Sequence, residues 1–192
     1  MNAKKLLRME MLEKRKNHTR EEIAQMSSLL VDNLWRMPEV VKAELLMGYL
    51  SFGREISLDG FIEQAQAVDK RICVPIIYDA QRSIIKPTLL DDIKAVQTAE
   101  LGIRIPQERH YVEAAAIDIV LVPGVAFSRS GQRLGMGKGY YDRFLPNTKA
   151  LRVGICAEYN LLDTLPTDEY DALMDYLVTP NGVIKITGNA AV

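Results

Sequence analysis

The stretch from Ile117 to Leu145 constrains the fold of this chain more than any other. Its apolar run, Ile119 to Val122, is rich in β-branched residues and is typical of a strand buried on both faces of a sheet. A Pro-Gly pair ends that run, and a loop follows with glycine at 131, 135, 137 and 139. Such a loop lets several backbone N–H groups converge on one anion. Residues 140–145 are compatible with a short helix, which would turn its positive end toward the same anion. Strand, loop and helix together predict a phosphate-binding site.

Charged residues around this loop indicate which phosphate it would bind. Arg133 enters the loop, Lys138 stands between two of its glycines, and Arg143 follows. Neither GxxxxGK[ST] nor a complete dinucleotide fingerprint is present, and a glycine-rich turn after a strand is often only a turn. Asp142 is a candidate ligand for the magnesium that accompanies nucleotide phosphates. The combination favours a nucleoside triphosphate site over a plain turn.

Residues 122–143, VPGVAFSRSGQRLGMGKGYYDR, resemble the signature of the 5-formyltetrahydrofolate cyclo-ligase family, also called 5,10-methenyltetrahydrofolate synthetases. The resemblance continues through YLSFGREI, through LPTDEYDALMDYLVTP, and through a Lys and an Arg near the start of the chain. One departure is Ser128, where the family usually carries an acidic residue.

The resemblance implies ATP- and magnesium-dependent cyclisation of 5-formyltetrahydrofolate to 5,10-methenyltetrahydrofolate, with release of ADP and phosphate. The ATP-binding residues that it implies are Lys4, Arg8, Arg133, Leu134, Gly135, Met136, Gly137, Lys138, Gly139, Tyr140 and Tyr141. The folate-binding residues that it implies are Leu50, Glu55, Met136, Gly137, Lys138, Gly139 and Tyr140. Magnesium would be held by Asp142 and Asp171. Lys138 and Arg133 would act catalytically, by offsetting charge on the transferring phosphoryl group.

Several of these assignments have a structural alternative. Lys4 and Arg8 are four residues apart and could form a solvated basic helix face. Glu55 could be a carboxylate at the entry of a helix, interacting with its dipole. Asp171 belongs to an acidic cluster with Asp168, Glu169 and Asp175, which alone would suggest a solvated turn. Two other functions also stay open: another ATP-using enzyme such as a small-molecule kinase, and a nucleotide-binding regulatory module without turnover.

Apolar periodicity and capping signals predict the remaining elements. The predicted helices cover residues 3–16, 19–36 and 57–68, the second starting at a capping box formed by Thr19 and Glu22. The predicted strands are 44–52, 71–76, 119–122, 151–157 and 176–179, while 83–106 is less informative. Alternating strands and helices predict one α/β domain over residues 1–192: three-layer, mostly parallel, with helices on both faces, Rossmann-like in outline.

Composition narrows the possible partners. With 24 basic and 25 acidic side chains the net charge is -1, so no overall field attracts nucleic acid. No apolar run approaches the ~20 residues of a membrane span, and the charged first residues do not resemble a secretory signal. We therefore expect a cytoplasmic protein that has no nucleic-acid or membrane partner. Its partners would be ATP and 5-formyltetrahydrofolate, possibly polyglutamylated.

Cys73 and Cys156 lie in apolar surroundings and are expected to be buried thiols.

Overall fold

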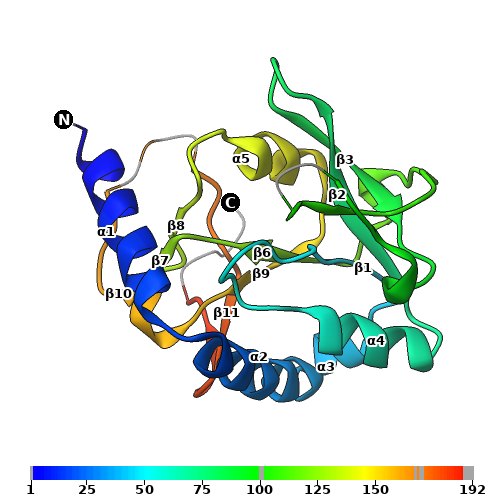
Figure 1. Cartoon of the computed structure of the whole chain (residues 1–192), viewed down its shortest axis with the longest axis horizontal. Helices are drawn as coiled ribbons and strands as arrows, with labels where there is room; N and C mark the ends of the chain where they lie inside the picture. Colours follow the sequence, from blue (N-terminus) through cyan, green and yellow to red (C-terminus); the bar gives the residue numbers. More distant parts are fainter. Residues whose placement is uncertain (1, 100–101, 167, 169–170, 188–192) are drawn as a thin grey trace.

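The computed structural model describes residues 2–99, 102–166, 168 and 171–187, and it is built on a seven-stranded sheet (Figure 1). The parallel strands are β1 Leu45–Met47, β2 Arg71–Asp79, β6 Ile119–Pro123, β9 Leu151–Ile155 and β11 Tyr176–Thr179. The antiparallel edge strands are β3 Ile84–Leu89 and β12 Gly182–Lys185. The strand order is β12-β11-β9-β6-β1-β2-β3. The prediction of a mostly parallel α/β fold is confirmed.

The order of the parallel strands reverses at β1. The chain first adds β2 on one side of β1 and then adds β6, β9 and β11 on the other side. In open α/β sheets, ligands bind beyond the carboxyl ends of the strands at such a switch point. Here that point lies where the chain leaves β1 and β6.

Helices lie on both faces of the sheet (Figure 1). The helices are α1 Ala3–Asn17, α2 Arg20–Trp35, α3 Pro38–Lys42, α4 Asp59–Ala67 and α5 Tyr140–Phe144. The helices α2, α3 and α4 cover one face and α5 lies on the other, while α1 packs beside the site end of the sheet. Short 3-10 turns occur at Ile93–Ala95, Ala114–Ala116, Leu145–Asn147 and Glu158–Asn160. Among the residues with described positions, no helix is both long and apolar enough to cross a bilayer.

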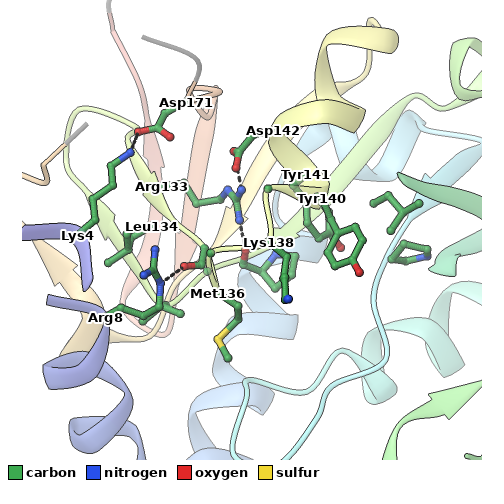
Figure 2. A pocket seen from close by; sticks show the side chains of 18 of the residues that line it. Lys4, Arg8, Arg133, Leu134, Met136, Lys138, Tyr140, Tyr141, Asp142 and Asp171 are labelled. Atoms are coloured by element: carbon green, nitrogen blue, oxygen red, sulfur yellow. Dashed lines mark hydrogen bonds and ion pairs between the residues drawn. The ribbon is translucent and has the colours of Figure 1, made fainter. Parts of the chain in front are cut away.

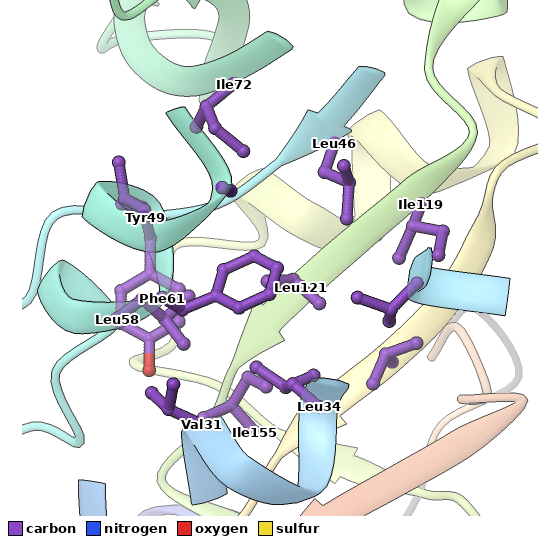
Figure 3. Packing of buried hydrophobic residues seen from close by; sticks show 14 of the residues in the cluster. Val31, Leu34, Leu46, Tyr49, Leu58, Phe61, Ile72, Ile119, Leu121 and Ile155 are labelled. Carbon is purple, nitrogen blue, oxygen red and sulfur yellow. The ribbon is translucent and has the colours of Figure 1, made fainter. Parts of the chain in front are cut away.

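Two apolar cores, one on each face of the sheet, hold these layers together, and a smaller third cluster lies under α1. Phe61 and Leu34 pack from α4 and α2 onto Leu121 of β6 (Figure 3), whereas the adjacent Val120 belongs to the core on the opposite face. Successive residues of a strand point to opposite faces, which is why one continuous apolar run serves both cores. Burying a single Leu or Phe side chain contributes about 1.5–3 kcal/mol.

Side-chain caps define where the first two helices begin. Asn2 caps α1 by accepting a hydrogen bond from Lys4 N at 3.0 Å. The capping box at the start of α2 is confirmed, since Glu22 N donates to Thr19 Oγ1 at 3.1 Å and Thr19 N donates to Glu22 Oε2 at 2.8 Å. The two cysteines are buried free thiols, as expected, and burial raises the pKa of Cys73 to about 12.

The strand predicted over 44–52 is much shorter than expected. After β1, Gly48 N still donates to Cys73 O, but the chain then leaves the sheet. The ring of Tyr49 turns into the core and its hydroxyl donates to Ile56 O at 2.8 Å. The apolar run does not reveal such a departure, because Tyr49 is buried although it lies off the sheet. Ser57, expected to start α4, precedes the helix and accepts a hydrogen bond from Asp59 N.

The segment between β6 and α5 contains regular strands and is not only a glycine loop. It contains a hairpin of β7 Ala126–Ser128 and β8 Arg133–Leu134, with β10 Leu161–Leu162 beside β7. Ser128 is buried, and its hydroxyl accepts from Gln132 N at 3.1 Å across the turn at Gly131. The unusual serine therefore stabilises this turn. A second small hairpin joins β4 Gln97–Thr98 to β5 Arg104–Ile105.

Candidate functional site

A pocket of about 620 Å³ opens beyond the carboxyl ends of β1 and β6. Its walls come from the exits of those two strands, from α1, from the β2–β3 hairpin and from residues 133–142 (Figure 2). Every predicted site residue except Leu50 lines it. Leu50 is not among the described lining residues, because the chain turns after Gly48 and Leu50, half-buried, packs against the core beneath α2 and α4. Its contact with the folate stays a prediction.

Three glycines of the loop each lie against an arginine side chain. A Cβ added to Gly135 would lie 2.7 Å from Arg133 Nη1, and one on Gly139 would lie 2.5 Å from Arg143 Nη1. A Cβ on Gly137 would lie 3.3 Å from the guanidinium carbon of Arg8. The absence of side chains thus lets three cationic groups crowd around one stretch of backbone.

The helix α1 turns two predicted cations toward this loop. Arg8 Nε donates to Gly135 O at 2.8 Å. Lys4 Nζ forms an ion pair with Asp171 at 2.5 Å (Figure 2) and another with Asp168 at 2.7 Å. Burial lowers the pKa of Lys4, but its hydrogen bonds to these two carboxylates outweigh that effect and raise the pKa above its usual value. Lys4 and Arg8 therefore do not form a solvated face. They lie on the same side of α1 as Met11, which is 1% exposed.

Arg133 is buried behind the loop, and its charge is already paired. Its Nη2 donates to Asp142 Oδ1 at 2.7 Å, and its Nη1 donates to Pro123 O at 3.3 Å. The guanidinium also lies 5.4 Å from the ring centre of Tyr141, whose pKa is raised by burial. This arrangement fixes the Asp142 carboxylate on the pocket wall. The helix α5 that follows has only five residues, so its dipole contributes less than the sequence suggested.

The two predicted magnesium ligands line the same pocket, each beside one cation. Asp142 pairs with Arg133 and Asp171 pairs with Lys4. In the part of the chain that the structure describes, no group of three or more His, Cys, Asp or Glu side chains is arranged to hold a metal. Magnesium is commonly held by one or two carboxylates together with substrate phosphates. The pair fits a magnesium ion shared with a nucleotide better than a protein-only metal centre.

Glu55 projects from the segment that follows β1. Its Oε2 accepts from Phe52 N at 3.0 Å, and its Oε1 lies 3.4 Å from Arg15 Nη1. The next helix begins only at Asp59, so Glu55 is not a residue of the helix entry.

Sequence reasoning missed the apolar wall of the pocket. Its members come from three distant segments, and several are exposed although they are large: Phe52 at 51%, Ile77 at 55% and Ile103 at 44%. Pro75 and Ile85 extend this wall on the β2–β3 hairpin. No local motif connects these segments, so nothing in the sequence pattern indicated that they share a wall. The pocket thus has a cationic glycine wall and an apolar wall.

Comparisons with known proteins agree with this geometry. The family model for the 5-formyltetrahydrofolate cyclo-ligase family matches residues 1–180. The 5-formyltetrahydrofolate cyclo-ligase of Escherichia coli K12 is 30% identical over 176 residues, covering 89% of this chain and 97% of that protein. A solved 5,10-methenyltetrahydrofolate synthetase from Aquifex aeolicus superposes with a TM-score of 0.86 at 30% identity, covering 100% of this chain and 96% of its own. Its counterpart from Mycoplasma pneumoniae, at 24% identity and a TM-score of 0.75, shows the same fold over 93% of this chain and 99% of its own. The resemblance seen in the sequence is confirmed, and the chain belongs to the 5-formyltetrahydrofolate cyclo-ligase family of enzymes.

Proposed function

We propose that this enzyme uses MgATP to cyclise 5-formyltetrahydrofolate to 5,10-methenyltetrahydrofolate, releasing ADP and phosphate. The observation that carries the proposal is the two-sided pocket, which offers cations and bare backbone on one wall and apolar side chains on the other. A triphosphate and a folate ring system would need those two environments side by side.

The triphosphate would lie along the glycine wall. Backbone N–H groups of residues 135–139 would bind phosphate oxygens, with Lys138, Lys4 and Arg8 as the surrounding cations. Lys138 is exposed on the loop, so its ammonium group can follow a phosphoryl group as charge moves during transfer.

Magnesium would be held by Asp142 and Asp171 together with phosphate oxygens. When bound, it would neutralise charge on the phosphates and on the leaving ADP. Arg133 would keep Asp142 on the pocket wall, through the ion pair that it makes with this carboxylate.

The folate would occupy the apolar wall. Phe52, Ile77 and Ile103 offer faces for a planar ring system, and Met136 adds a flexible side chain that is 60% exposed. The carboxylate of Glu55 can accept hydrogen bonds from N–H donors of the pterin. A polyglutamate tail on the substrate remains a prediction, as do the cytoplasmic location and the absence of a nucleic-acid partner.

The main task of the protein in this reaction is to position the reacting groups of the two substrates. A formamide carbon is a poor electrophile, so the formyl oxygen first attacks the γ-phosphorus and ADP leaves. The resulting iminium phosphate is attacked at carbon by N10, which loses its proton, and the C–O bond to phosphate then breaks. Attacking and accepting groups both belong to the substrates, so the enzyme has to align them and stabilise phosphoryl charge.

The test compares ATP consumption with and without 5-formyltetrahydrofolate, following 5,10-methenyltetrahydrofolate by its absorbance. We expect one ADP for each methenyl product and no ADP release without the folate. Turnover without the folate would indicate another ATP-using enzyme, and binding of ATP without any turnover would indicate a regulatory module.

A further inference from the structure

Arg15, at the far end of α1 from Lys4, joins the exits of the two strands that frame the site. Its Nη2 donates to Gly124 O at 2.8 Å, just beyond β6. Its Nη1 lies 3.4 Å from Glu55 Oε1, beyond β1. We infer that Arg15 is a positioning residue that holds Glu55 in the orientation that binds folate. The inference rests on the proposed function.

Arg15 acts from beneath the pocket. Glu55 and Gly124 line the pocket, and Arg15 is not among its described lining residues. The guanidinium lies instead in a small space of about 10 Å³ with Tyr49 and Tyr159. That space is about large enough for one water molecule and far too small for a substrate. Any effect of Arg15 on folate must therefore pass through the groups that it holds.

The bonds around Glu55 explain why its orientation depends on Arg15. One carboxylate oxygen accepts from Phe52 N, three residues away in the same irregular segment, and the other faces Arg15. The Phe52 bond fixes the carboxylate only to its own segment. Arg15 ties it to the end of β6 and to α1, so losing the guanidinium would free the carboxylate to rotate and leave it with one charge-assisted partner fewer.

The same helix holds groups for both substrates at opposite ends. Lys4, Arg8, Met11 and Arg15 fall on one face, because their spacings of four, three and four residues follow the helical repeat. Lys4 and Arg8 face the phosphate-binding wall, whereas Arg15 faces Glu55. A substitution at Arg15 should consequently affect the folate and spare the nucleotide.

The test is Arg15→Gln, with Lys5→Gln as the control. Lys5 is exposed on α1, and its change removes the same charge. We expect Arg15→Gln to raise the KM for 5-formyltetrahydrofolate and its calorimetric Kd about tenfold, the effect of one lost charge-assisted bond. The KM for ATP and the thermal shift produced by MgATP should stay at wild-type values, and Lys5→Gln should change neither substrate.

A double-mutant cycle separates positioning from structural damage. If Arg15 acts through Glu55, the variant carrying Arg15→Gln and Glu55→Gln binds folate no more weakly than Glu55→Gln alone. Should Arg15→Gln fail to fold, Arg15→Lys serves in its place. We expect a smaller rise in the folate KM, because a lysine ammonium keeps the positive charge but can reach only one of the two partners, Glu55 or Gly124 O. Equal losses for both substrates, additive effects in the cycle, or wild-type folate KM would overturn the inference.

The wild-type assay distinguishes this inference from the function on which it rests. If wild-type protein forms no 5,10-methenyltetrahydrofolate from ATP and 5-formyltetrahydrofolate, the proposed function and the inference both fail. If wild type turns over normally and Arg15→Gln behaves identically, only the inference fails.

Discussion

Glycine at 137 satisfies two requirements at one position. Its φ of 96° lies in the region that L side chains rarely adopt, and an added Cβ would press on the guanidinium of Arg8. The sequence pattern suggested glycine for its conformational freedom and for close phosphate approach. The arginine beside it could not be foreseen, because Arg8 precedes it by more than a hundred residues.

Gly137→Ala should weaken ATP binding about tenfold, because backbone strain of ~1–2 kcal/mol and displacement of Arg8 both disturb the loop. Gly60→Ala is the matched control, since a Cβ there meets nothing within 4 Å and alanine suits helix α4. Calorimetric titration with MgATP measures the difference. Equal affinities in the two variants would contradict the proposed role of the loop.

Lys138→Met should lower kcat about a hundredfold, the usual cost of removing one group that stabilises charge in the transition state. The midpoint of thermal unfolding should stay at the wild-type value, because the side chain is exposed. Lys149→Met, at an exposed lysine outside the pocket, is the control and should retain wild-type turnover. Steady-state rates at saturating substrates test this, and an unchanged kcat for Lys138→Met would remove Lys138 from catalysis.

At the scale of the element, α1 both packs beside the pocket and supplies two of its cations. Its inward stripe combines apolar side chains, which pack on Val125, Ala126 and Leu134, with the cations that reach the pocket. A basic residue on such a helix can be expected to face solvent, and only the family resemblance favoured the inward reading for Lys4 and Arg8.

Changing Lys4 and Arg8 together to Gln should remove most of the thermal stabilisation that MgATP gives the protein. Without ligand the midpoint should fall modestly, because Asp168 and Asp171 lose their cation and Gly135 O loses a donor. The control changes Lys5 and Lys16 to Gln, since both lysines are exposed on the same helix. Differential scanning fluorimetry with and without MgATP measures both effects. An equal ATP shift in the two double variants would confine the nucleotide site to the loop.

The elements predicted well are those defined by local chemistry. The capping box fixed the start of α2, and the charge and leucine pattern fixed α1. The elements missed or misjudged depend on distant partners. The strand β1 stops early because Tyr49 finds a place in the core, and β12 exists because it pairs with β11. Leu50 lies outside the described pocket lining for the same reason that β1 ends early.

At the scale of the whole molecule, the site lies where the strand order of the sheet reverses. The glycine wall was predictable because one continuous motif carries it. The apolar wall was not, since it combines the β2–β3 hairpin with Phe52, which follows β1, and with Ile103, which precedes β5. The pocket residues Ile85, Tyr140 and Tyr141 belong to or pack against the core on the α5 face, whereas the core in Figure 3 lies on the opposite face with α2 and α4.

Two phenylalanine truncations should separate scaffold from site. Phe61→Ala removes a fully buried ring and should cost about 3–5 kcal/mol of unfolding free energy, with the KM for folate unchanged while the protein is folded. Phe52→Ala removes a half-exposed ring of the pocket and should raise the folate KM several-fold with little loss of stability. Urea unfolding and steady-state kinetics on both variants test this. A folate effect of similar size in both would mean that the apolar wall is not a binding surface.

The residues that α1 contacts also determine how early in folding this helix can dock. Arg15 and Gly124 are 109 residues apart, Arg8 and Gly135 are 127 apart, and Lys4 and Asp171 are 167 apart. A nascent chain can form α1 early, since helices need only local contacts, but the helix must wait for almost the whole polypeptide before it can dock. During that interval its apolar stripe lacks its final partners. The pocket is accordingly among the last parts of the molecule to mature, and a chain that stops before Asp171 lacks the ion pair between Lys4 and Asp171.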